Sequence, residues 1–259
     1  MYDVEREKKI LEVLEQRGTV GVNRLAEIVY CSGSTIRRDL SRLEKKGLIK
    51  RSFGAVSLAN TVATDETAFS VRESENIAVK KHLSKAAAEQ LKSNQTIFID
   101  SSTTLINIVP YLNSFKNLLI VTNGVRIASE ISYRTNHKLI MIGGSIDSHT
   151  NSTIGSAALS QLNGLHFDVA IMSCAGVTMD FGFSEASFEM AELKKAALNN
   201  ATTKIMVFDE TKFGKNKAFQ SAHINNLNLI ITTPELSQTI VEDIQKLGVN
   251  VIKSSNELF

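Results

Sequence analysis

The sequence has little cysteine, little net charge and no long hydrophobic run. Its 259 residues include only two cysteines, Cys31 and Cys174, which lie far apart in the chain. A framework of disulfide bonds is therefore not expected, and a reducing compartment fits this composition. No apolar run reaches the roughly 18 residues of a membrane-spanning helix, and the charged first ten residues differ from a signal peptide. We expect a cytoplasmic protein without a membrane span.

The sequence also lacks the motifs that mark common metal and catalytic sites. Its five histidines show no H-E-x-x-H or paired spacing, and no cysteine pair is present to complete a zinc site. A G-x-S-x-G nucleophile elbow and a phosphate-binding P-loop are missing as well. We therefore expect no metal, no cofactor and no catalytic residue.

The net charge is only +2, but the charges are unevenly distributed. Residues 1–57 carry 12 basic and 8 acidic side chains, whereas the remainder carries 17 basic and 19 acidic ones. Within residues 34–51 seven basic side chains stand against two acidic ones. This asymmetry favours a polyanion as the partner of the N-terminal part, with a solvated basic helix face as the alternative.

Apolar spacing predicts two helices before residue 30. The first covers residues 5–17 and should stop at Gly18. A short extended piece over residues 19–22 follows it. Asn23 can then cap a second helix, whose apolar residues include Leu25.

A third helix is the candidate for DNA recognition. It should begin near Ser32 or Ser34, after a tight turn, and run to about Lys46, with Gly47 as its stop. A helix fits the major groove, where arginine bonds guanine bidentately while hydroxyls and the helix N-terminus hold phosphate. Its inward face should consist of residues spaced by four and three, namely Ile36, Leu40 and Leu43.

Two short strands should follow this helix and form a wing. They cover residues 48–51 and 55–58, on either side of Ser52-Phe53-Gly54. Basic side chains on the first strand can contact the DNA backbone or the minor groove. The candidate DNA-binding residues of helix and wing together are Ser32, Ser34, Thr35, Arg37, Arg38, Arg42, Lys50 and Arg51.

The stretch S-G-S-T-I-R-R-D-L-S-R-L-E-K-K-G-L-I-K-R resembles the DNA-binding domain of the DeoR family of bacterial transcriptional regulators. The resemblance implies that the helix beginning at Ser32 is the recognition helix, capped by that serine. Cys31 replaces a hydrophobic residue of the family, and Ser52-Phe53-Gly54-Ala55 replaces the frequent H-G-G-A of the wing. Asp39 is expected to be structural, and a surface ion pair to Asp39 or Glu44 is the alternative role for the arginines at 37 and 38.

The rest of the chain predicts a linker and a second domain. We place a winged helix-turn-helix at residues 1–58, a polar linker at 59–75 and an α/β domain at 76–259. In the last segment, short apolar strands alternate with helices, which predicts a doubly wound, mostly parallel sheet covered on both faces. The expected strands cover residues 97–99, 118–122, 139–142, 169–172, 205–208, 229–231 and 249–252.

Hydroxyl groups and glycines follow several of these strands. Ligands of such sheets bind beyond the carboxyl ends of the strands, where free N–H groups and helix dipoles favour anions. Serine, threonine and asparagine also cap helices, and glycine is common in turns, so a structural role is the alternative for any single loop. The candidate effector-binding residues are Asp100, Ser101, Ser102, Thr103, Thr104, Asn123, Gly143, Gly144 and Lys212.

The motifs D-S-S-T-T, V-T-N-G, I-G-G-S, D-E-T-K-F-G and L-I-I-T-T resemble, in this order, the sensor domain of the DeoR family. The resemblance implies a fold similar to sugar-phosphate isomerases and a phosphorylated sugar as effector. It places residues 100–104 in the phosphate loop, Asn123 and Gly143-Gly144 on the pocket floor, and Lys212 against the effector. Ser102 replaces a usual glycine, and Thr233 a usual aspartate.

Together these features predict a homo-oligomeric repressor, a dimer or tetramer, that binds a double-stranded operator of a carbohydrate-metabolism operon and is relieved by a phosphorylated sugar. One alternative is an isomerase-like enzyme with an appended DNA-binding module, in which Asp100, Asp209 or Glu185 would serve as general base. A plain architectural DNA-binding protein is the other.

Overall fold

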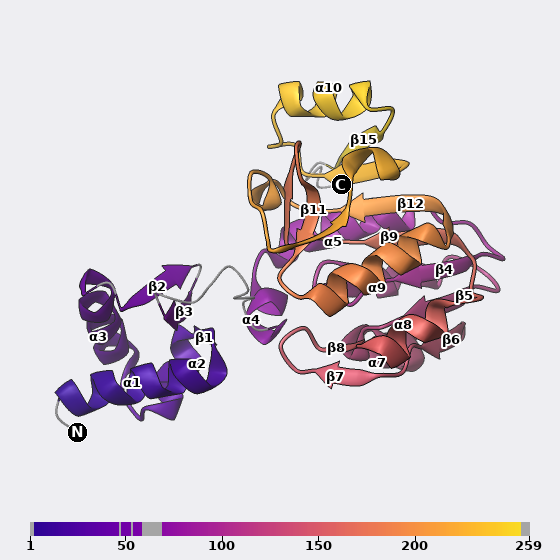
Figure 1. Cartoon of the computed structure of the whole chain (residues 1–259). Helices are drawn as coiled ribbons and strands as arrows, with labels where there is room; N and C mark the ends of the chain where they lie inside the picture. The colour runs from indigo at the N-terminus through magenta and orange to yellow at the C-terminus, as the bar shows by residue number, and fades with distance from the viewer. Residues whose placement is uncertain (1–2, 47, 53, 59–68, 255–259) are drawn as a thin grey trace. The chain divides into compact units, whose positions relative to one another are not determined.

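The computed structural model describes residues 3–46, 48–52, 54–58 and 69–254. Contacts divide the chain into two compact units, Met1–Glu75 and Asn76–Phe259, which are drawn in Figure 1 and described separately.

The N-terminal unit is a winged helix-turn-helix, as predicted. Its first three helices pack around one apolar cluster that includes Ile10, Leu14 and Leu25, together with the predicted inward face of the third helix. Its strands form an antiparallel sheet in the order β1-β3-β2. The elements are α1 (Asp3–Arg17), β1 (Val20–Gly21), α2 (Val22–Ile28), α3 (Gly33–Lys45), β2 (Ile49–Ser52) and β3 (Ala55–Leu58).

One helix start differs from the prediction. The chain passes directly from β1 into α2, so Gly21 is the N-cap and no side chain caps the helix. Asn23 lies inside α2 and is exposed, and its predicted role as a cap is wrong. The predicted stop at Gly47 and the wing residue Phe53 lie outside the described residues.

The predicted linker at 59–75 contains a short helix, α4 (Phe69–Ser74). Phe69 is buried, and Arg72 lies over its ring at 5.9 Å. Residues 59–68 lie outside the described residues, so the linker's limits stay a prediction.

The C-terminal unit is built on a seven-stranded sheet in the order β15-β14-β12-β9-β4-β5-β6, in which all neighbouring strands are parallel. This confirms the predicted parallel α/β fold. The strands are β4 (Thr96–Ile99), β5 (Leu119–Thr122), β6 (Lys138–Met141), β9 (Phe167–Met172), β12 (Ala201–Val207), β14 (Leu229–Thr232) and β15 (Asn250–Lys253).

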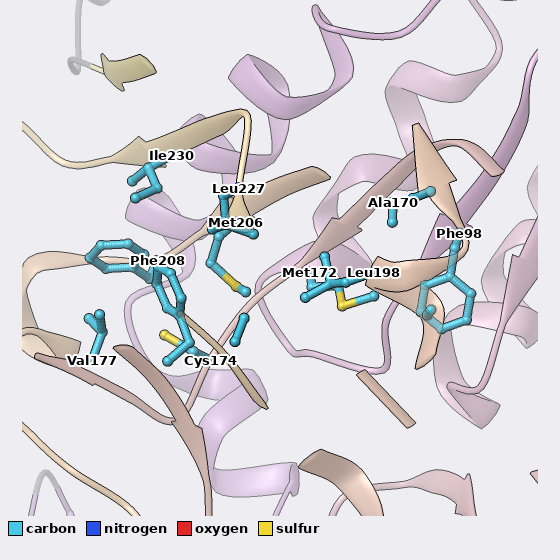
Figure 2. Packing of buried hydrophobic residues seen from close by; sticks show 14 of the residues in the cluster. Phe98, Ala170, Met172, Cys174, Val177, Leu198, Met206, Phe208, Leu227 and Ile230 are labelled. Carbon is cyan, nitrogen blue, oxygen red and sulfur yellow. The ribbon is translucent and has the colours of Figure 1, made fainter. Parts of the chain in front are cut away.

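Side chains of the central strands alternate between two apolar layers. In β4, Phe98 points into one cluster, and Ile97 and Ile99 point into the other. Figure 2 shows the first cluster, where Phe98, Ala170, Met172, Met206 and Ile230 gather from four neighbouring strands. Because both faces of the strands are buried, their sequences are continuous apolar runs rather than alternating ones.

Helices cover the two faces in separate groups. The first face packs against α8 (Ser156–Leu162), α9 (Phe188–Asn199) and α10 (Gln238–Lys246). The second packs against α5 (Ile77–Ala88), η1 (Leu105–Ile108), α6 (Val109–Leu112) and α7 (Val125–Arg134). The chain runs from β4 outward to β6 with helices on the second face, and from β9 outward to β15 with helices on the first. The strand order therefore reverses between β4 and β9, where sheets of this kind bind their ligands.

Two small antiparallel sheets were not predicted. One is the hairpin of β7 (Ser145–Asp147) and β8 (Ser152–Ile154). The other contains β10 (Gly176–Thr178), β11 (Gly182–Glu185) and β13 (Phe219–Ala222). Their strands have only three or four residues each, too short for a clear alternating pattern. In the described residues no helix has the length and apolarity to cross a membrane.

The turn between β10 and β11 depends on Gly182. Its φ is +78°, and a Cβ there would lie 2.3 Å from the carbonyl oxygen of Ala222 on β13. Gly248 has a similar φ of +83° but open space around its Cα.

We expect Gly182→Ala to destabilise the protein by about 1–3 kcal/mol more than Gly248→Ala, because only the former adds a clash with backbone to the left-handed conformation. Urea unfolding of the two variants measures the difference. Equal losses would show that β13 can move away from β11 at little cost.

Candidate functional site

The recognition helix α3 begins as predicted, with Ser32 as its N-cap. The Ser32 Oγ accepts a hydrogen bond from the backbone N–H of Thr35 at 3.2 Å. It also lies 2.9 Å from the Ser34 Oγ and 2.8 Å from the Thr35 Oγ1. The three hydroxyls therefore form one exposed group at the N-terminus of the helix, the end that favours phosphate.

Arg37 and Arg38 lie on the exposed side of α3. Within the described residues their side chains make no hydrogen bond or ion pair, and the same is true of the Lys50 side chain on β2. The alternative of an ion pair from these arginines to Asp39 or Glu44 therefore finds no support. Their guanidinium groups are available to a partner.

Asp39 binds two arginines at the point where α3 meets α1. Its carboxylate is 1% exposed and accepts hydrogen bonds from the Arg6 Nε at 2.5 Å and the Arg6 Nη2 at 3.1 Å. Arg42, one turn further along α3, donates to the same carboxylate. Asp39 thus joins the recognition helix to α1, in agreement with the structural role expected of it.

Two of the candidate DNA-binding residues, Arg42 and Arg51, already contact side chains of the N-terminal unit. Arg42 is only partly exposed, and its Nε lies 3.3 Å from the Glu7 Oε1 in addition to its contact with Asp39. Arg51 lies 3.3 Å from the Ser41 Oγ and 3.8 Å from the Glu44 Oε2. The expected outward orientation of Arg42 is therefore corrected, because two carboxylates hold its guanidinium group against the helices.

In the C-terminal unit, the loop after β4 lies at the point where the strand order reverses. Asp100 is fully buried, and its Oδ1 accepts from the Ser102 N–H at 2.9 Å while its Oδ2 accepts from the Ser173 N–H at 2.9 Å. Asp100 therefore ties together the loops after β4 and β9. Both of its oxygens are used, so we assign it to holding the phosphate loop rather than to contacting an anion.

The remainder of this loop presents backbone donors. The Ser102 Oγ accepts a hydrogen bond from the Leu105 N–H at 3.3 Å, where η1 begins. The N–H groups of Thr103 and Thr104 have no hydrogen-bond acceptor in the part of the chain that the structure describes. Unpaired N–H groups next to a helix start are the usual elements of a phosphate site.

The loop after β5 lies against the loop after β4. A Cβ at Gly124 would lie 2.8 Å from the Cα of Ser101, so glycine is required for this approach. The neighbouring Asn123 is fully buried and donates from Nδ2 to the Thr153 carbonyl at 3.3 Å. Its Oδ1 has no partner among the described residues, an arrangement that buried amides usually avoid.

The two glycines after β6 differ in their availability. Gly143 donates its N–H to the Gln161 Oε1 at 3.0 Å, and its carbonyl accepts from the Gln161 Nε2 at 3.2 Å. Its backbone is therefore already paired, whereas Gly144 is exposed. Two residues of the expected pocket floor remain candidates for ligand contact. The Asn123 Oδ1 lacks a hydrogen-bond donor among the described residues, and the Gly144 backbone is exposed.

Lys212 lies in the short helix η2 (Glu210–Lys212) that follows β12, with Asp209 as its cap. Glu210 is held by Thr233, whose Oγ1 donates to the Glu210 Oε2 at 2.6 Å. The hydroxyl that replaces the family's usual aspartate therefore holds this helix by a hydrogen bond to the Glu210 carboxylate. Lys212 is partly exposed and positioned beside the buried Cys174.

Sequence reasoning missed Lys194 of α9, which is buried at the same edge of the sheet. Its Nζ lies 2.7 Å from the Glu185 Oε1, 2.7 Å from the Ser173 carbonyl oxygen and 3.2 Å from the Asp100 Oδ2. A signal was present, because Lys194 falls four residues after Met190 and three before Ala197 on the buried stripe of α9. A lysine on an apolar stripe indicates a buried charge pair.

The buried groups around Lys194 have shifted pKa values. Burial opposes the charged form of Lys194, but Glu185 and Asp100 outweigh it and raise the pKa of the ammonium. Burial and the Glu185 carboxylate raise the pKa of the Cys174 thiol, which is thus protonated and unreactive. Within the described ranges no group of three or more histidine, cysteine, aspartate or glutamate side chains is placed to hold a metal ion.

Known protein families match both units. The DeoR-like helix-turn-helix domain matches residues 6–62, and the DeoR C terminal sensor domain matches residues 75–233. The HTH-type transcriptional regulator GolR of Listeria innocua is 30% identical over 97% of this chain and 98% of its own length. The glycerol-3-phosphate regulon repressor of Escherichia coli is 30% identical over 90% of this chain and 91% of its own. The chain belongs to the DeoR family of transcriptional regulators.

Solved structures are similar to part of the chain. Ribose 5-phosphate isomerase from Plasmodium falciparum shares 12% identity over 54% of this chain and 54% of its own, with a TM-score of 0.40. The eIF2B delta protein of Chaetomium thermophilum shares 11% over 60% and 56%, with a TM-score of 0.42. We describe the fold of the C-terminal unit by its strand order and not by these similarities.

The Asp39 pairs make a testable contribution to the N-terminal unit. We expect Asp39→Asn to destabilise this unit by about 3–5 kcal/mol, because it removes the buried carboxylate charge that Arg6 and Arg42 both bind. Chemical unfolding followed by a signal from this unit measures the loss. Glu27→Gln, which removes an exposed pair with Arg24, is the control and should cost about 0–1 kcal/mol.

The pH dependence provides a second check on the same pairs. Burial opposes the charge of Asp39, but hydrogen bonds from Arg6 and Arg42 outweigh it and lower the pKa of the carboxyl. A lowered pKa contributes stability above the ordinary value of about 4, and this stability is lost as the pH falls through the folded value. Asp39→Asn should lack that component, and an unchanged pH profile would contradict the ionic role.

Proposed function

We propose that this DeoR-family regulator is a repressor of a carbohydrate-metabolism operon and that a phosphorylated sugar, bound at the carboxyl edge of the seven-stranded sheet, relieves the repression. The observation that supports it best is the pair of unpaired N–H groups at Thr103 and Thr104, located at the reversal of strand order. The named Escherichia coli relative, a glycerol-3-phosphate regulon repressor, agrees with a phosphorylated effector.

The DNA-binding surface is proposed to consist of the N-terminus and exposed side of α3 together with the wing. The hydroxyls of Ser32, Ser34 and Thr35 would hold phosphate, and Arg37 and Arg38 would contact base edges. Lys50 would meet the DNA backbone from β2. We give Arg42 and Arg51 secondary roles, because both already bind carboxylates within the unit.

The effector site is proposed to hold the phosphate on the loop after β4 and the sugar toward Asn123, Gly144 and Lys212. Lys212 would supply a positive charge, and the Asn123 Oδ1 would accept a hydrogen bond from a sugar hydroxyl. Such a hydroxyl would satisfy the buried amide oxygen that has no other partner among the described residues.

The groups that an isomerase would need as general base are engaged in structural contacts. Asp100 is bound by two backbone N–H groups and Lys194, and Glu185 by Lys194. Asp209 caps η2 and accepts from the N–H and the hydroxyl of Thr211. These contacts favour a sensor over an enzyme, because a general base must be free to take a proton from substrate.

The protein is proposed to act as a homo-oligomer, a dimer or tetramer, since two-fold operators are read by two-fold proteins. Effector and operator would then shift one equilibrium between two arrangements of the oligomer. Linkage requires that operator DNA weaken effector binding by the same factor by which effector weakens operator binding.

We expect Arg37→Ala and Arg38→Ala each to lower operator affinity by about 1–3 kcal/mol if the side chain reads a base. The operator would be isolated by selection from random duplexes, and affinities would be measured over a range of salt concentrations. Arg24→Ala, a change of an exposed arginine on α2, is the matched control. An arginine whose removal leaves both affinity and sequence preference intact does not belong to the reading surface.

We expect Lys212→Ala to leave operator affinity unchanged and to weaken effector binding by about tenfold or more, because one charge-assisted contact is lost. Lys215→Ala is the control, since Lys215 is a nearby exposed lysine. The effector would first be found by thermal shift with glycerol 3-phosphate and phosphorylated pentoses and hexoses, each beside its unphosphorylated form.

The same mixtures would be analysed for turnover. Binding of one phosphorylated compound without product, followed by release of the operator, is the expected result. Isomerised product would instead identify an enzyme, and a wild-type response of Lys212→Ala would show that the effector binds elsewhere.

A further inference from the structure

We infer that Lys194 is the positioning residue of the effector site, because its buried ammonium fixes the loops after β4 and β9 to α9 and β11. This inference rests on the proposed function, since it concerns the same anion site. It assigns to an internal side chain the ordering of groups that would contact the effector.

The contacts of Lys194 join four separate segments. Its Nζ reaches Asp100 after β4, the Ser173 carbonyl after β9 and Glu185 at the end of β11, while its own backbone lies in α9. In the sequence these partners are up to 94 residues apart.

Asp100 transmits this order to the proposed phosphate loop. Its Oδ1 holds the Ser102 N–H and its Oδ2 holds the Ser173 N–H, so the direction of the carboxylate sets both loops. Lys194 lies 3.2 Å from the Oδ2. A fixed carboxylate keeps the following N–H groups, at Thr103 and Thr104, turned away from it and free for a ligand.

Charge gives Lys194 a second effect on the site. Asp100 and Glu185 are both buried, and Lys194 is the cation that contacts each of them. Without it, two buried carboxylates would lose the cation that they share, behind a loop that is proposed to bind phosphate. They would repel each other and the effector, since buried charges are weakly screened.

Cys174 offers a way to test this arrangement in the full chain. The thiol is buried beside Ser173, among the residues shown in Figure 2. In a Cys31→Ser background it is the only cysteine, so its reaction with N-ethylmaleimide reports opening of the loop after β9. Lys194 lowers the pKa of this thiol, so loss of its charge alone would slow the reaction, whereas loss of the tether would speed it.

We would compare Lys194→Met with Lys195→Met, which removes the next lysine of the same helix, paired with Glu192 away from the site. The inference expects Lys194→Met to react at least about tenfold faster than the background chain and Lys195→Met to react within about twofold of it. A cooperative unfolding transition of the C-terminal unit, as in the background chain, would show that this unit is folded. An unchanged or slower reaction of Lys194→Met overturns the inference.

A second variant covers the case in which Lys194→Met does not fold. Lys194→Met combined with Glu185→Gln has the same net buried charge as the native cluster but lacks the tether. It should also react at least about tenfold faster than the background chain. A rate equal to the background in this variant overturns the inference, because charge balance alone would then keep the loops in place.

Inorganic phosphate separates this inference from the proposed function. It should protect Cys174 in the background and Lys195→Met chains, and at least about tenfold more should be needed in Lys194→Met. If phosphate and glycerol 3-phosphate protect none of the chains, the proposed effector site fails, while the rates without phosphate still decide the role of Lys194. Equal protection in all chains, despite faster reaction of Lys194→Met, overturns the link between the tether and the anion site.

Discussion

Each functional element of this protein is held by a buried aspartate bound to a cation from another element. In the N-terminal unit Asp39 joins α3 to Arg6 of α1, and in the C-terminal unit Asp100 joins the loop after β4 to Lys194 of α9. A carboxylate removed from water must be paired, and the geometry of the pair is narrow when hydrogen bonds complete it. In both units the constraint therefore fixes a surface that we propose to bind a ligand, while each aspartate uses its oxygens within the protein. Removing either cation would cost stability and order at once.

The same constraint separates the arginines of α3 by function. Arg42 forms ion pairs with Asp39 and Glu7 inside the unit. The side chains of Arg37 and Arg38 are exposed, and no described residue competes for them. An exposed guanidinium group without a partner retains most of its attraction for phosphate and base edges, because no intramolecular pair has to be broken first. The basic segment that the composition shows is thus divided into a structural part and a free part.

The sequence predicted what depends on local pattern. The stripe of Ile36, Leu40 and Leu43 identified α3, and apolar runs identified the seven strands of the parallel sheet. The signal is strongest for the central strands, which are buried on both faces, and weaker for the exposed edge strand β6. The small antiparallel sheets escaped prediction, since their strands are short and their pairing depends on distant partners such as β13. The predicted cap at Asn23 is wrong because a capping residue can be identified only when the first residue of the helix is known. The helix follows β1 directly, so its N-cap is Gly21.

The sequence predicted which strand ends carry the candidate effector site, but not the hydrogen bonds that connect the loops there. Nothing local indicates that Asp100 uses both oxygens on backbone N–H groups, or that Gln161 pairs the backbone of Gly143. These contacts depend on which strands become neighbours, and that order is settled by the packing of whole layers. Once β4 and β9 are adjacent, an acidic residue at the end of one and an amide at the start of the next loop must meet. The hydrogen bonds of Asp100 therefore give it a structural role within the protein, and in the proposed effector site the contact with the ligand would fall to the neighbouring backbone N–H groups.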